Sequence, residues 1–277
     1  NMNNPANALW KLTAFREEFR QKPSELVDIQ ESKIAYHAGA TLEQAQPVGH
    51  SVIEVNNRED LQAVLNTNAG SGKTLFLRAG EYRLKQSLTI PSDIHICGEG
   101  RSTVLICEPT IRTAAILLGD LDAKNITIEN LVVDGSKEHQ DAYDPNSGRF
   151  YRTGRYSNAL AGISMRGEAG HAFSNIKLKN LTVINFSRSG VYISDAEGIE
   201  IHHCDFTENG AHVVPGPRLQ HNLMIQHSSN IMIKDSRFDT SIRGCGLVLD
   251  HCKSLKVENC EIARNGWHGL LMAECHN

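Results

Sequence analysis

Short runs of alternating apolar and polar residues recur along the chain from about residue 124 onward. Each run has alternating apolar positions, then a polar or small pair, then another apolar residue. The five runs are NITIENLVV, NIKLKNLTV, GIEIHHCDF, NIMIKDSRF and SLKVENCEI, anchored on Ile126, Ile176, Ile199, Ile231 and Leu255. The anchors lie 50, 23, 32 and 24 residues apart, which indicates a coil of 23–24 residues with two longer insertions. Alternation over so few residues predicts β-strands.

A second apolar strand occurs in each coil. These strands are GISM (162–165), GVYIS (190–194), NLMIQ (222–226), GLVLD (246–250) and GLLMA (269–273). Strands this short cannot each bury an apolar face alone, so successive coils must stack like residues on like residues. One column of the repeat suits a tight bend where side chains hydrogen-bond between coils, and it comprises Asn130, Asn180, His203, Asp235 and Asn259. The pattern therefore predicts an all-β solenoid, a parallel β-helix.

The segment TNAGSGKTLFL (67–77) ends like a phosphate-binding P-loop. The P-loop pattern requires a glycine where this chain has Thr67. Its flanks are also reversed, because the preceding REDLQAVL has helical spacing and the following TLFLRAGEYRL reads as strand. A P-loop needs a helix after the loop to direct N–H groups at phosphate. We therefore interpret Gly70 and Gly72 as a turn from a cap helix into the first coil.

The ends of the chain differ from the repeat. Residues 1–48 do not repeat, and NALWKLTAFREEFRQKPSEL is amphipathic enough for one helix, so we expect an N-terminal helical or irregular extension before a β-helix over 49–277. The last unit, NGWHGLLMAECHN, stops where another coil would begin. Since solenoids need polar end caps, we expect further C-terminal coils, or a partner subunit or self-association covering this end.

Composition narrows the function classes. A net charge of −4 and an isoelectric point near 6.4 give no basic field, which argues against general nucleic-acid binding. No apolar run approaches the ~18 residues of a membrane span. Seven cysteines without a CxxC pair indicate neither a zinc site nor a disulfide scaffold, so we read them as small buried residues.

The segment NREDLQAVLNTNAGSGKTLFLRAGEYRLKQSLTI, with the later GEGRSTVL, resembles the opening of right-handed parallel β-helix (pectin lyase-like) proteins. Together with the repeat, the resemblance covers roughly residues 50–277. This superfamily is typified by pectate lyases, polygalacturonases and phage tailspikes. The resemblance implies a secreted, extracellular or periplasmic protein acting on a polysaccharide. It leaves the reaction open, because the fold hosts lyases, hydrolases, epimerases and adhesins.

Two insertions interrupt the solenoid, at 136–160 and 211–220. Each insertion follows the equivalent strand of its own coil and leads into the equivalent next strand. We therefore expect both insertions to rise beside one sheet. In the enzymes that the chain resembles, the substrate groove runs along that sheet. Strand alternation turns one set of side chains outward there, and its candidate substrate-binding members are Arg166, Tyr192 and Gln226, with His268 at a strand start.

The first insertion interleaves cationic and aromatic residues: Tyr151, Arg152, Arg155 and Tyr156. Aromatic rings offer flat faces to sugars, and arginine binds carboxylate or sulfate bidentately. These residues are therefore candidates for binding an anionic glycan. The alternative is an arginine-rich loop paired with Asp141 and Asp144.

The candidate catalytic residues are Arg218, His221 and Asp250. Elimination across a uronic acid needs a base and a neutralised carboxylate, which Arg218 and His221 would supply; the alternative is a loop anchor and a structural histidine. Asp250 would form a hydrolase pair with Asp195 or Glu274, or a calcium site with Asn222 and Gln226. No polygalacturonase-like aspartate trio is present, and calcium is the only cofactor that the pattern suggests.

The leading hypothesis is a polysaccharide lyase or glycoside hydrolase that cleaves an anionic, uronate-type polysaccharide in this groove. The second is a non-catalytic carbohydrate-binding or structural β-helix of the tailspike or adhesin type. A third, a polyuronate epimerase, would share the groove and the abstraction of the α-proton.

Overall fold

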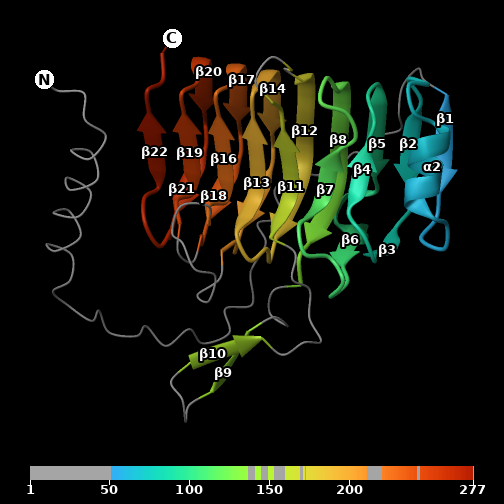
Figure 1. Ribbon diagram of the computed structural model, residues 1–277, viewed down its shortest axis with the longest axis horizontal. Helices are drawn as coiled ribbons and strands as arrows, with labels where there is room; N and C mark the ends of the chain where they lie inside the picture. Colours follow the sequence, from blue (N-terminus) through green and yellow to red (C-terminus); the bar gives the residue numbers. More distant parts are fainter. Residues whose placement is uncertain are drawn as a thin grey trace, which may run out of the picture. The chain divides into compact units, whose positions relative to one another are not determined.

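Successive coils of the chain stack through parallel strands (Figure 1). The computed structural model describes residues 51–136, 141–144, 149–152, 160–168, 171, 173–210, 220–241 and 244–276. The predicted N-terminal extension, residues 1–48, lies outside them and stays a prediction. In the described part no helix has the length and apolar character needed to cross a membrane.

Two parallel sheets form the walls of the solenoid. The thirteen-stranded sheet follows the order β1 (Val52–Val55), β2 (Thr74–Leu77), β5 (Ile94–Gly98), β8 (Lys124–Asp134), β12 (Phe173–Ile184), β14 (Ala196–His202), β17 (Ser229–Lys234) and β20 (Lys253–Glu258), with β3 (Gly80–Leu84), β6 (Thr103–Cys107), β15 (Asp205–Thr207), β18 (Arg237–Asp239) and β21 (Glu261–Ala263) paired beside this path. The seven-stranded sheet comprises β4 (Leu88–Ile90), β7 (Ala114–Leu118), β11 (Ala161–Arg166), β13 (Ser189–Ser194), β16 (Leu223–Gln226), β19 (Leu247–Asp250) and β22 (Leu270–Ala273). A separate antiparallel hairpin joins β9 (Asp141–Asp144) to β10 (Arg149–Arg152).

The predicted register between coils is confirmed. The anchor residues pair in one continuous row, Ile126–Ile176–Ile199–Ile231–Leu255. The first four are buried, and Leu255 packs against the same core. Burying one such side chain contributes about 1.5–3 kcal/mol, so the repeated rows supply the main driving force for stacking.

The bend column also behaves as predicted. All five members have left-handed backbone, with φ between 47° and 57°. Asn180 Nδ2 donates to Asn130 Oδ1 across 3.0 Å, and Asn259 Nδ2 donates to Asp235 Oδ1. Asparagine tolerates this backbone best after glycine, which explains the composition of the column.

The cap helix is confirmed as α2 (Leu61–Thr67). Asp60 caps it, because Asp60 Oδ1 accepts from the Ala63 N–H at 3.1 Å. Gly70 and Gly72 then adopt φ of 67° and 65° and lead directly into β2. A strand therefore follows the loop, and the phosphate-cradling geometry of a P-loop does not form.

In the seven-stranded sheet, alternation sets the direction of the side chains but not their exposure. Leu270 and Met272 continue the inward rows of β19 but are 44% and 51% exposed, because no described coil stacks beyond β22. Conversely, Met224 and Val248 point away from the main core yet are 7% and 3% exposed. They form a small second apolar cluster with Cys245, against which Tyr192 and Leu271 pack.

A buried amide network fills the corner before the seven-stranded sheet. Asn209 Oδ1 accepts from the Phe186 N–H, and Asn209 Nδ2 donates to Val183 O and to Asn222 Oδ1. Asn222 Nδ2 donates onward to Asp239 O and Asn265 Oδ1. A Cβ at Gly190 would lie 2.6 Å from Asn209 Nδ2, so glycine at the strand start leaves room for the network.

The network corrects the calcium hypothesis. Asn222 is fully buried and both of its amide atoms are engaged inside the solenoid. Its oxygen therefore does not face the outward surface beside Asp250, where a calcium ligand would have to lie.

We expect Asn209→Ala to lower the free energy of unfolding, because it leaves buried partners of the amide unsatisfied at about 1–3 kcal/mol. Chemical denaturation of both proteins measures the difference. The control is Asn66→Ala in the exposed part of α2, which we expect to change stability by less than about 0.5 kcal/mol. Equal effects of the two substitutions would contradict a structural role for the network.

Candidate functional site

Both insertions leave and re-enter the solenoid at the same corner. The first runs from β8 to β11 and the second from β15 to β16. Their starting strands share one row, since Ile184 of β12 pairs with both Asp134 and Thr207. Their receiving strands share another, Ile163–Val191–Leu223. The described ends of both insertions therefore border the seven-stranded sheet, and the course of the insertions between these ends stays a prediction.

A chain of polar contacts crosses the outward face of this sheet from coil to coil. The Arg166 guanidinium lies 4.6 Å from the centre of the Tyr192 ring. Tyr192 Oη donates to Gln226 Oε1 at 2.8 Å, and Gln226 Nε2 donates to Asp250 Oδ2 at 2.8 Å. Four strands, β11, β13, β16 and β19, thus each supply one member. The structure brings together these four of the predicted site residues.

His251 continues the chain of contacts at the bend after β19. Its Nδ1 lies 2.7 Å from Asp250 Oδ1, and its Nε2 lies 2.9 Å from Glu274 Oε2. Its ring also packs on that of His227, with centroids 5.1 Å apart. We name Arg166, Tyr192, Gln226, Asp250, His251 and Glu274 the polar ladder.

The contacts of His251 determine its charge. A ring that donates from both nitrogens must be the imidazolium form. The hydrogen bond to Asp250 is the main reason that the pKa of His251 is raised, with the Glu274 carboxylate adding to it. Asp250 and His251 therefore form a carboxylate–imidazolium pair, which is an arrangement able to take up or release a proton at a bound ligand.

His251 also changes the expected pairing of carboxylates. The sequence suggested Asp195 or Glu274 as the acid partner of Asp250, but His251 contacts both Asp250 and Glu274. The missed signal is the histidine directly after Asp250, which has left-handed backbone and contacts both carboxylates.

Other predicted site residues lie elsewhere. His221 is 2% exposed and does not face the groove. Its Nδ1 accepts from the Cys245 N–H at 3.0 Å. A catalytic role for His221 stays a prediction. His268 packs on the Trp267 ring, with centroids 4.7 Å apart. The remaining candidates fall outside the described residues or have side chains outside them: Tyr151, Arg152, Arg155, Tyr156 and Arg218.

A shallow open depression lies on the other sheet, across β12, β14, β17 and β20. Asn175, Glu197, Asn230 and Lys256 contribute to its lining. Because these four side chains are exposed and no buried polar group converges there among its described lining residues, we regard the ladder as the better candidate site.

The stacked coils and the outward polar ladder define a parallel β-helix protein with a side-chain array along one sheet. The chain belongs to the family described as right handed beta helix region, whose model matches residues 121–277. No curated protein matches the chain.

Several solved structures are similar to the chain. ORF18 of Geobacillus virus E2 matches with a TM-score of 0.56 at 17% identity, covering 76% of this chain, which spans 42% of that protein. The mannuronan C-5 epimerase AlgE4 A-module of Azotobacter vinelandii matches with a TM-score of 0.42 at 13% identity, covering 80% and 77% of the two chains. The tailspike gp49 of Acinetobacter baumannii bacteriophage Fri1, a capsular polysaccharide depolymerase, matches with a TM-score of 0.37 at 12% identity, covering 82% and 48%.

We expect His251 to titrate above the ordinary histidine pKa of about 6.5, and Asp250→Asn to shift the midpoint back toward that value. The raised pKa means that the stabilising pairing is complete below about pH 6.5 and is lost as the pH rises through the folded-state pKa. Nuclear magnetic resonance of the imidazole Cε1–H measures both midpoints. An unchanged midpoint in Asp250→Asn would contradict the pairing.

Proposed function

We propose that the protein is a secreted carbohydrate-active enzyme that binds and cleaves an anionic polysaccharide along the polar ladder. The observation that carries this proposal is the unbroken series of contacts from Arg166 to Glu274 across successive coils. Strands in a sheet repeat every ~4.8 Å, so an extended polymer lying across them meets a new polar side chain at each coil.

Each part of the ladder offers a different interaction to a sugar. Tyr192 presents a half-buried aromatic ring. The hydrogen bond from its hydroxyl to Gln226 holds the ring in a fixed orientation. Arg166 is exposed and supplies a fixed positive charge suited to a carboxylate or sulfate. The arginines of the first insertion would add to that charge if they lean over the same sheet.

Asp250 and His251 supply the proposed proton transfer. The imidazolium would donate a proton to a leaving oxygen, or Asp250 would take one from the substrate or from water. The same pair serves hydrolysis or elimination, and an α-proton transfer without cleavage would be epimerisation. The chemistry of the products distinguishes these reactions.

A non-catalytic glycan-binding or structural protein is the second candidate. One observation favours it: the ladder side chains satisfy one another through their own hydrogen bonds and ion pairs. A row of side chains closed on itself would hold coils together without any ligand.

We expect the protein to cleave at least one member of a panel of uronate polymers, and Asp250→Asn to lower kcat by ~100-fold or more. Absorbance of unsaturated products reports elimination, a reducing-sugar assay reports hydrolysis, and nuclear magnetic resonance of the polymer reports epimerisation. Glycan binding without turnover on every polymer would support the second candidate instead.

The matched control is Asp235→Asn. Asp235 also lies at a bend and contacts a histidine, His203 at 3.9 Å, but it belongs to the thirteen-stranded sheet. We expect wild-type turnover from this variant. If Asp250→Asn keeps full activity while its circular dichroism and melting temperature match the wild type, the ladder is not the catalytic site.

A further inference from the structure

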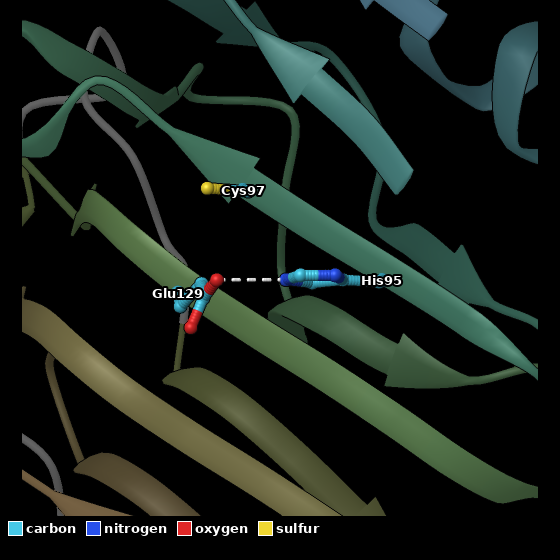
Figure 2. Close-up of side chains that lie close together, drawn as sticks. All are labelled: His95, Cys97 and Glu129. Atoms are coloured by element: carbon cyan, nitrogen blue, oxygen red, sulfur yellow. Dashed lines mark hydrogen bonds and ion pairs between the residues drawn. The ribbon is translucent and has the colours of Figure 1, made fainter. Parts of the chain in front are cut away.

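Three chemically distinct side chains meet on the outward face of the first coils, on the thirteen-stranded sheet rather than the seven-stranded sheet of the ladder. His95 and Cys97 project from β5 and Glu129 from the adjacent β8 (Figure 2). Two-residue spacing puts His95 and Cys97 on one face of their strand, and the register pairs Cys97 with Glu129. One nitrogen, one sulfur and one carboxylate oxygen lie within 4.8 Å of one another.

The hydrogen bonds of His95 orient its ring toward this cluster. His95 Nε2 lies 2.8 Å from Glu129 Oε1, and Nδ1 lies 3.0 Å from Thr74 Oγ1 on β2. A hydroxyl both donates and accepts, so Thr74 can accept from Nδ1–H when Nε2 turns its lone pair to a ligand. That second contact is compatible with the tautomer that a metal needs, in the position where metal-bound histidines have an outer partner.

Cys97 and Glu129 supply the charge that a divalent cation needs. The Cys97 thiol is buried, which raises its pKa to about 11, and Asn130 Nδ2 donates to its sulfur at 3.4 Å. The hydrogen bond from His95 is the main cause of the lowered pKa of Glu129. With both groups ionised and the imidazole neutral, the three side chains carry two negative charges.

We propose that His95, Cys97 and Glu129 form a three-ligand binding site for Zn²⁺, with a fourth coordination position open to solvent. Zinc takes nitrogen, thiolate and carboxylate ligands in tetrahedral geometry. Bond lengths of about 2.0–2.3 Å place tetrahedral ligands ~3.3–3.8 Å apart, so side-chain shifts on the order of 1 Å convert the cluster into a site.

The exposure of the three side chains shows which side of the site faces solvent. Cys97 is covered, whereas the His95 and Glu129 side chains remain 28% and 21% exposed. An ion therefore reaches the cluster from the His95–Glu129 side. Because binding requires loss of the thiol proton, affinity rises with pH and each ion bound releases a proton.

The test is a titration of the chelator-treated full chain with Co²⁺ and then Zn²⁺. We expect one equivalent of Co²⁺ to give a near-ultraviolet thiolate charge-transfer band, Zn²⁺ to abolish it by displacement, and Zn²⁺ to raise the melting temperature. Cys97→Ser should remove the band, and Thr74→Val should weaken metal affinity by ~10–100-fold through loss of the outer contact.

Controls separate this cluster from other thiols and histidines. Cys260→Ser changes a half-buried cysteine at a distant bend, and His251→Gln breaks the histidine–carboxylate group of the polar ladder; both should keep the band. Absence of the band in folded wild-type protein, or its survival in Cys97→Ser, would overturn the proposal. Circular dichroism of each metal-free variant establishes that it is folded.

Discussion

The in-register stacking of coils is the constraint on which the rest of the structure depends. No strand here can bury its apolar face alone, so each row of isoleucine, leucine or valine is stable only when the next coil repeats it. The chain must therefore turn at the same positions in every coil. Left-handed residues make these turns, at a backbone cost of roughly 1–2 kcal/mol each for a residue other than glycine. Hydrogen bonds such as Asn180 to Asn130 offset part of that cost.

The same register builds the two clusters of reactive side chains. The polar ladder takes its members from consecutive coils of the seven-stranded sheet, whereas His95, Cys97 and Glu129 come from two neighbouring coils of the thirteen-stranded sheet. In both cases residues 24 or more positions apart in sequence become direct neighbours. Most of these groups lie on strands, and His251 and Glu274 lie on the bends directly after strands, which favours the fixed geometry that ligand binding requires.

The strand columns could be read from the sequence because burial imposes a strict alternation on them. Arg166, Tyr192, Gln226 and Asp250 followed from that alternation and do lie together. The burial of Met224 and Val248 did not follow from it, because alternation assigns the direction of a side chain but does not say what covers that face of the sheet.

Contacts between distant or irregular segments were harder to predict. His221 is buried, and its ring accepts a hydrogen bond from the backbone of Cys245, 24 residues away. The group around Cys97 lies in the first coils, where the repeat is too weak in sequence to align Glu129 with Cys97. Only the paired register of β5 and β8 shows that the two are neighbours.

The burial of the cysteines has a consequence for chemical durability. All seven are thiols, and five are buried. Burial raises the pKa of Cys204 to about 12 and also raises that of Cys252, while their sulfurs face backbone carbonyls of Leu178 and Ile225. Oxidation and disulfide exchange proceed through the thiolate, which such sites hardly populate. Folding thus shields these buried thiols from oxidation and from disulfide exchange.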